Sequence, residues 1–192
     1  MDRKHFGFMI FTVAVVAAAV FQGDTMADQD FSYQSSFCTL RYPKGWTLRE
    51  SKGKTEAYTQ VHVFGERNKD LGFGPSITLT VYPKKDKGGV YASAQALADH
   101  AVQAAHGLSS FKLESRSTVK LPFGIDALRC VMTYVLRLPI YQVNAKDVLL
   151  KEETYYFEKG DDIYVLSYKN TDVDFAAQES LFLDTLESFK LS

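Results

Sequence analysis

Neither charge sign dominates this chain, and cysteine, proline and tryptophan are scarce. Its 192 residues include 22 Lys and Arg against 23 Asp and Glu, which gives a formal net charge of −1. A chain with this balance offers no general attraction to nucleic acid or to anionic lipid. With two cysteines and no Cys-x-x-Cys pair, the sequence indicates neither a redox motif nor a zinc site. We therefore expect no nucleic-acid partner.

Signatures of catalysis and of cofactor binding are also missing. The chain contains no HExxH motif, GxSxG motif, Walker loop or dinucleotide fingerprint. His100 and His106 stand six residues apart on a predicted helix, whereas two side chains must be three or four residues apart to share a metal on one helix face. His62 falls in a predicted strand, where a hydrogen-bonded structural role is the simpler interpretation. The sequence thus predicts no catalytic residue, metal ligand or cofactor, and a hydrolase that uses His62 or His100 beside a carboxylate is the least favoured alternative.

The one long apolar run stands near the amino end. Arg3, Lys4 and His5 precede an apolar segment over residues 6–21, and Thr25 and Ala27 place small residues before a possible cleavage point. This pattern predicts a secretory signal peptide over residues 1–27 and a single domain over residues 28–192, periplasmic or secreted. The alternative is an uncleaved anchor, which is the only membrane attachment that the sequence indicates.

Export changes how the two cysteines are interpreted. Cys38 and Cys130 both fall in the mature part, each within a strand-like run. In an oxidising compartment such a pair can form a disulfide. Two buried thiols that act as small apolar groups are an equally good interpretation.

The mature part combines predicted strands and predicted helices in the manner of an α+β domain. Residues 28–36 are polar and predict an extended arm, and residues 90–106 predict a helix. Strands are predicted over residues 37–42, 46–49, 57–64, 76–82, 111–121, 125–138 and 148–158. In residues 76–82 we expect Ile77, Leu79 and Val81 to point inward. Short connections between consecutive strands favour antiparallel pairing, with two helices covering one face of the sheet or both.

The last forty residues organise the predicted fold. Two β-rich runs joined by Lys159-Gly160-Asp161-Asp162 are typical of a hairpin. An amphipathic helix follows, with Thr171 as its cap and Asp174 completing a capping box. Its apolar stripe must be buried against the preceding sheet and consists of Phe175, Phe182, Leu186 and Phe189.

Two segments resemble a known family. Tyr42-Pro43-Lys44-Gly45-Trp46 resembles the YPxGW opening of the PsbP-like family, which includes bacterial exported relatives and the Mog-type Ran-binding proteins. Residues 164–168 and 182–191 resemble the closing strand and helix of that family, so the likeness covers about residues 31–191. The resemblance implies an antiparallel β-sheet flanked by helices in an α/β/α sandwich, and a role that is mostly non-enzymatic.

These observations favour a non-catalytic exported accessory or binding protein whose protein partner is unidentified. We expect docking through two loops at one end of the sheet, residues 65–75 and 83–89. Lys84, Lys85 and Lys87 in the second loop would favour an acidic partner. The alternative is a small-ligand carrier with an apolar pocket between the sheet and the helices.

Overall fold

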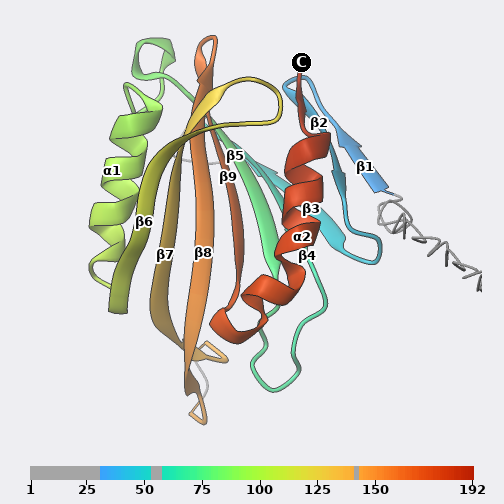
Figure 1. Cartoon of the computed structure of the whole chain (residues 1–192), viewed down its shortest axis with the longest axis vertical. Helices are drawn as coiled ribbons and strands as arrows, with labels where there is room; N and C mark the ends of the chain where they lie inside the picture. The colour runs from blue at the N-terminus through green and yellow to red at the C-terminus, as the bar shows by residue number, and fades with distance from the viewer. Residues whose placement is uncertain (1–30, 53–57, 141–142) are drawn as a thin grey trace, which may run out of the picture.

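A seven-stranded antiparallel sheet forms the centre of the domain (Figure 1). The computed structural model describes residues 31–52, 58–140 and 143–192, so the predicted leader over residues 1–27 lies outside the described residues. The strand order is β3-β4-β5-β9-β8-β7-β6. The strands are β3 (Thr47–Lys52), β4 (Thr59–Phe64), β5 (Ser76–Pro83), β6 (Ser109–Lys120), β7 (Asp126–Leu138), β8 (Lys146–Lys159) and β9 (Asp162–Thr171). The predicted alternation in β5 is confirmed, because Ile77, Leu79 and Val81 are all buried.

A second, three-stranded sheet lies beside the first and has the order β1-β2-β10. It contains β1 (Phe31–Gln34), β2 (Cys38–Tyr42) and β10 (Lys190–Leu191). The segment predicted as an extended arm, residues 28–36, is extended over β1, but it also pairs antiparallel with β2, which the sequence did not predict. The rings of Phe31 and Tyr42 stack across this pair, 5.7 Å apart, so a cross-strand contact stabilises a segment that looks polar in isolation.

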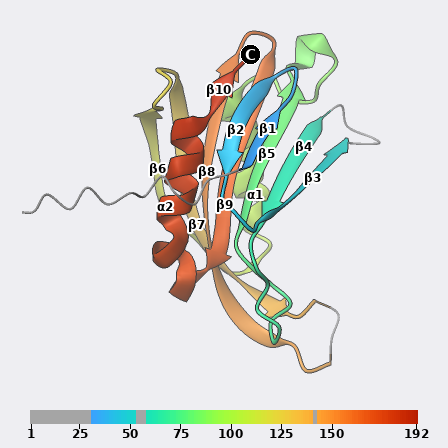
Figure 2. The ribbon, with the colours of Figure 1, turned by 90° about the vertical axis from the view of Figure 1, so that its right-hand side faces the viewer.

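Helix α2 (Asp172–Ser188) and the small sheet cover one face of the large sheet (Figure 2). The predicted apolar stripe is confirmed: Phe175, Phe182, Leu186 and Phe189 are all buried, with Phe189 directly after the helix. The capping box forms only through its side chains, because the Thr171 hydroxyl donates to Asp174 Oδ2 at 2.7 Å and caps no backbone N–H.

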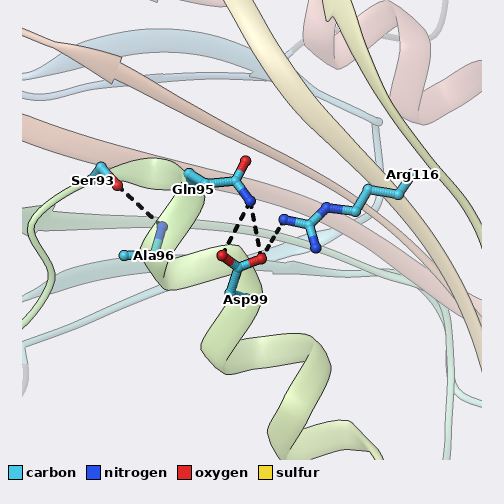
Figure 3. A network of polar contacts seen from close by, with 5 residues as sticks. All are labelled: Ser93, Gln95, Ala96, Asp99 and Arg116. Atoms are coloured by element: carbon cyan, nitrogen blue, oxygen red, sulfur yellow. Dashed lines mark hydrogen bonds and ion pairs between the residues drawn. The ribbon is translucent and has the colours of Figure 1, made fainter.

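Helix α1 (Ala94–Ala105) lies on the opposite face, so helices cover both sides of the sheet. It packs Leu97 and Ala98 over Cys130 and Met132 of β7 and over Tyr156 of β8. The helix begins at Ala94, four residues later than predicted, because the Ser93 hydroxyl accepts a hydrogen bond from the Ala96 N–H at 3.1 Å (Figure 3). A short 3-10 helix, η1 (Lys85–Lys87), precedes it.

The two cysteines lie on opposite sides of the sheet. Cys38 belongs to the core under α2 and Cys130 to the core under α1, and both are buried free cysteines. Burial raises the pKa of Cys38 to about 11 and also raises the pKa of Cys130. A bond between them would have to pass through the sheet, so this structure shows the buried-thiol arrangement.

Candidate functional site

Helix α1 covers only part of its face of the sheet because two contacts hold it over β6 to β8. Asp99 of the helix forms an ion pair with Arg116 of β6 and accepts hydrogen bonds from Gln95 (Figure 3). At the start of the helix, the Ala94 N–H donates to Glu158 Oε1 of β8 at 2.7 Å. Within the described part of the chain, no helix therefore lies over β3 and β4 on this side.

We call this uncovered surface the open face. Strand side chains alternate between faces, so every second residue of β3, β4 and β5 points to it. The antiparallel registers place Arg49 beside His62 and His62 beside Thr78, which gives one row across three strands. The open face consists of Arg49, Tyr58, Gln60, His62, Phe64, Thr78, Thr80 and Tyr82.

Hydrogen bonds between its own side chains fix the polar part of the open face. His62 Nε2 lies 2.5 Å from Gln60 Oε1, and His62 Nδ1 lies 3.0 Å from Thr78 Oγ1. Because the amide oxygen of Gln60 can only accept, we assign the proton to Nε2, and the Thr78 hydroxyl then donates to Nδ1. Gln60 Nε2 donates to Thr80 Oγ1 at 2.9 Å. Four side chains thus form one continuous chain of hydrogen bonds.

The surroundings of His62 favour its neutral form. Burial is the main cause that lowers the pKa of His62, and the positive charge of Lys169 lowers it further. The imidazole ring also stacks on Phe64, with centroids 5.4 Å apart and planes 10° from parallel. Both nitrogens are hydrogen-bonded and the ring is packed, so His62 is oriented as part of a rigid surface.

The order Thr78–His62–Gln60 places a hydroxyl, an imidazole and an amide in a line, as a nucleophile, a base and an orienting group would be. Acyl transfer also needs donors aimed at the developing oxyanion. Around His62 the backbone N–H groups of β4 and β5 belong to the sheet ladder. Among the described residues, no group of three metal-ligating side chains occurs. What this arrangement provides is hydrogen-bonding surface.

Aromatic rings continue the open face toward helix α1. Tyr58 contacts Tyr82, Tyr82 contacts Tyr91, and Tyr91 contacts His100, with centroids 5.5, 5.9 and 5.5 Å apart. The Tyr91 hydroxyl lies 3.0 Å from His100 Nδ1, so the partner of His100 is a phenol and not a carboxylate. Half-buried tyrosines next to amide and hydroxyl groups are the composition of many recognition surfaces.

The structure separates the two loops that sequence analysis combined. Residues 65–75 lead into β5 at one end, and residues 83–89 leave it at the other (Figure 1). The prediction that both loops lie at one end of the sheet is wrong, because an uninterrupted strand of eight residues separates them.

Two of the three predicted docking lysines already have acidic partners. Lys84 Nζ lies 2.7 Å from Glu158 Oε2, and Lys87 Nζ lies 3.2 Å from Asp161 Oδ2. The hydrogen bond to Glu158 is the main cause that raises the pKa of Lys84. Lys85 is exposed and makes no ion pair within the described ranges. The sequence hides these pairs because Glu158, near the end of β8, and Asp161, in the β8–β9 turn, are far from the lysines along the chain.

Sequence analysis missed Arg49, which lies in the row with His62. It is exposed and forms no ion pair with the part of the chain that the structure describes. Its place depends on the β3–β4 register, for which the sequence carries only a weak signal, a short polar strand.

An acidic pair under α2 was also missed. Glu153 is 2% exposed, and its Oε1 accepts from Arg129 Nε at 2.6 Å and from the Tyr155 hydroxyl. Its Oε2 has no hydrogen-bond partner among the described residues. Burial raises the pKa of Glu179 on α2, and the neighbouring Glu153 raises it further. A protonated Glu179 can supply the donor that Glu153 lacks.

The structure also has open hollows at both ends of β5. One of about 520 Å³ is lined partly by Tyr58, Val81 and Asp162, and another of about 480 Å³ is lined partly by Phe64 and Phe73. Between the sheet and the helices lie two clusters of buried core side chains. Among the described residues, no helix is both long and apolar enough to span a bilayer.

Comparison with known proteins identifies the fold. No protein-family model matches the sequence, and no curated protein matches it significantly. A crystal structure from Bacteroides thetaiotaomicron superposes with a TM-score of 0.52 at 9% identity, over 85% of this chain and 49% of that one. The chain thus spans about half the length of that protein.

Two further structures are similar over most of their length. LpqN of Mycobacterium tuberculosis, described as involved in cell envelope biogenesis, has a TM-score of 0.51 at 16% identity, covering 81% of this chain and 83% of LpqN. Cyanobacterial PsbP (CyanoP) of Synechocystis has a TM-score of 0.50 at 13% identity, covering 88% of this chain and 96% of CyanoP. From its antiparallel sheet, its two helices and these neighbours, we conclude that the chain has the α+β fold of the PsbP-like proteins.

Proposed function

We propose that this chain is a non-catalytic, exported binding or accessory protein that docks a protein partner on its open face. The observation that carries the proposal is the open face, whose polar and aromatic side chains are mostly half-buried and which no helix within the described ranges covers. Internal hydrogen bonds hold the polar part of this face in one arrangement, so a partner meets a preorganised surface and less conformational entropy is lost on binding.

Charge favours an acidic partner. Arg49 lies on the open face, and Lys85 is held next to its aromatic end because the Lys85 N–H donates to the Tyr91 carbonyl at 2.8 Å. Neither side chain has an acidic partner among the described residues. Association should therefore weaken as salt rises, since exposed charges are screened within about 10 Å at 0.1 M ionic strength. Lys84 and Lys87 contribute less, because Glu158 and Asp161 already neutralise them.

Export is the second part of the proposal. It is supported by the charged start, the apolar run and the small residues before Asp28. The involvement of LpqN in cell envelope biogenesis is in keeping with it. Mass spectrometry of the protein from the envelope fraction should find Asp28 as its first residue. Material that retains residues 1–27 in that fraction would support the uncleaved anchor, and a purely cytosolic full-length species would contradict export.

The docking test compares one charge reversal on the open face with a matched reversal elsewhere. The full chain, tagged at its carboxyl end, is expressed in its source cell as the parent, as Arg49→Glu and as Lys112→Glu. Lys112 is an exposed cation on β6, at the other edge of the sheet. Quantitative mass spectrometry after mild crosslinking then measures the proteins recovered with each.

We expect at least one partner to be lost with Arg49→Glu and retained with Lys112→Glu, and its recovery with the parent to fall as salt is raised. Circular dichroism should show both variants folded, because both positions are exposed. If every recovered partner binds the Arg49→Glu variant as well as the parent at low salt, the open face is not the docking surface.

A further inference from the structure

A separate hollow opens between the loop over residues 65–75 and the end of β7. We call it the loop hollow, and its volume is about 480 Å³. Its walls are mostly apolar, and one cation stands at its edge. The lining residues are Phe64, Arg67, Gly72, Phe73, Gly74, Ser76, Leu138, Pro139 and Ile140. This volume lies within the range of about 300–1,000 Å³ that small-molecule sites occupy.

Hydrogen bonds within the loop hold the hollow in shape before any ligand binds. The Gly65 N–H donates to the Pro75 carbonyl at 2.9 Å, and the Asn68 N–H donates to the Phe73 carbonyl at 2.8 Å. Asn68 Oδ1 accepts from the N–H groups of Asp70 and Leu71 at 2.9 and 3.1 Å, which is an Asx turn. These hydrogen bonds thus hold the loop in one defined conformation.

Close packing fixes this loop both where its two ends meet and where its middle contacts the core. A Cβ added to Gly74 would lie 2.5 Å from the Glu66 carbonyl oxygen, so only glycine allows the backbone this approach. Leu71 and Phe73 pack against the buried side chains of Tyr134, Leu138 and Leu150. The apolar wall of the hollow therefore continues the core.

Two features of the hollow favour a ligand: a large apolar side chain is exposed to solvent, and one cation makes no ion pair with the described residues. Ile140 is 57% exposed, which is high for a large aliphatic side chain. Arg67 is exposed and makes no hydrogen bond or ion pair with the described part of the chain; neither Glu66 nor Asp70 pairs with it. Lys169, which lies opposite Ser76 on the neighbouring strand β9, already pairs with Glu152 at 2.9 Å, and Lys69 and Lys146 line an adjoining hollow.

We propose that the loop hollow binds a small amphipathic carboxylate, with its hydrocarbon part against Phe64, Phe73 and Ile140 and its carboxylate on the Arg67 guanidinium. Arginine suits this role because its planar fork binds a carboxylate through two parallel hydrogen bonds. A neutral hydrocarbon would leave Arg67 without a partner. A small anion with almost no hydrocarbon would leave the apolar wall in water.

The experiment separates these three ligands by titration calorimetry of the purified chain. The probes are octanoate, octan-1-ol, which has the same hydrocarbon chain without the charge, and acetate, which has the charge with almost no hydrocarbon. We expect saturable binding of octanoate, at least tenfold weaker binding of octanol and no measurable binding of acetate. Chemical-shift changes in NMR spectra should concentrate in residues 64–76 and 138–140.

Two variants test which cation binds the carboxylate of octanoate. Arg67→Gln should weaken octanoate binding at least tenfold and leave octanol binding unchanged. Lys69→Gln removes an exposed cation two residues away that does not line the hollow, and it should change octanoate affinity less than twofold. Equal binding of octanoate and octanol, an unaffected Arg67→Gln variant, or no saturable octanoate binding would each overturn the proposal. The loop hollow meets the open face at Phe64, but failure of these tests is distinguishable from failure of docking, because Arg49→Glu tests the open face with a different readout.

Discussion

Replacing Phe182 with alanine tests the packing of α2 most directly. Phe182 is 0% exposed, and its ring stacks on Tyr168 with centroids 5.5 Å apart and planes 16° from parallel. The ring also meets Tyr155 at 5.9 Å. Truncation of a buried phenylalanine costs about 3–5 kcal/mol of unfolding free energy, from lost transfer energy and from the cavity that remains.

The local geometry places the expected cost in the upper half of that range. Two aromatic pairs are lost at once, and such pairs stabilise by about 0.5–1.5 kcal/mol beyond the area they bury. The wall opposite the new cavity is the large sheet, which cannot collapse inward without breaking ladder hydrogen bonds. For a domain of this size we expect the melting temperature to fall by about 10 °C, since each kcal/mol corresponds to about 2–4 °C.

The assay is urea unfolding of the purified protein, followed by circular dichroism. Leu183→Ala is the matched control, because Leu183 is the next residue of the same helix and is 42% exposed. We expect this control to lose less than about 1 kcal/mol. A loss below about 1 kcal/mol for Phe182→Ala, or equal losses at the two positions, would show that α2 does not pack as described.

Three further predictions follow from the polar and sulfur groups. Because burial and Glu153 raise the pKa of Glu179, its stabilising contribution is complete below its usual pKa of 4.5 and is lost as pH rises through the raised value. Glu179→Gln should therefore flatten the fall of the urea midpoint as pH rises above 4.5, and an unchanged profile would contradict the shared proton. Ser93→Ala should cost about 1 kcal/mol in the same assay, because it removes the cap of α1, whereas Ser93→Asn should cost little. Cys38 and Cys130 should resist a thiol reagent in the native state, and both should react once the protein unfolds in urea; if neither reacts after unfolding without a reductant, the two form a disulfide.

The elements that sequence analysis predicted well carry their signal in their own periodicity. The stripe of α2 and the alternation of β5 follow from the spacing of apolar residues within one segment, so no knowledge of their neighbours is needed. The hairpin of β8 and β9 is equally local, since a Gly-Asp turn joins two β-rich runs.

What sequence analysis missed depends on contacts between distant segments. β1 has only four residues and alternates Phe31 and Tyr33 with polar side chains, a pattern too short to predict a strand until β2 is known to pair with it. Two contacts can be predicted only when the strand order is known. They are the ion pair of Lys84 with Glu158 and the row formed by Arg49, His62 and Thr78. The candidate site was therefore harder to predict than the fold, because it is a property of register and not of any single strand.

The pairing of β1 and β10 with the same short strand has a mechanical consequence. Both run antiparallel to β2, with Phe31 opposite Tyr42 at one end and Leu191 opposite Cys38 at the other. A pull on Phe31 and an opposite pull on Leu191 would therefore act along the strands. Such a force loads the β1–β2 hydrogen bonds in shear, all together, and does not unzip them one by one. If residues 1–27 stay attached as an anchor, tension between that anchor and a partner on the open face would pass through β1 and β2, so this small sheet would carry the load together with the large sheet.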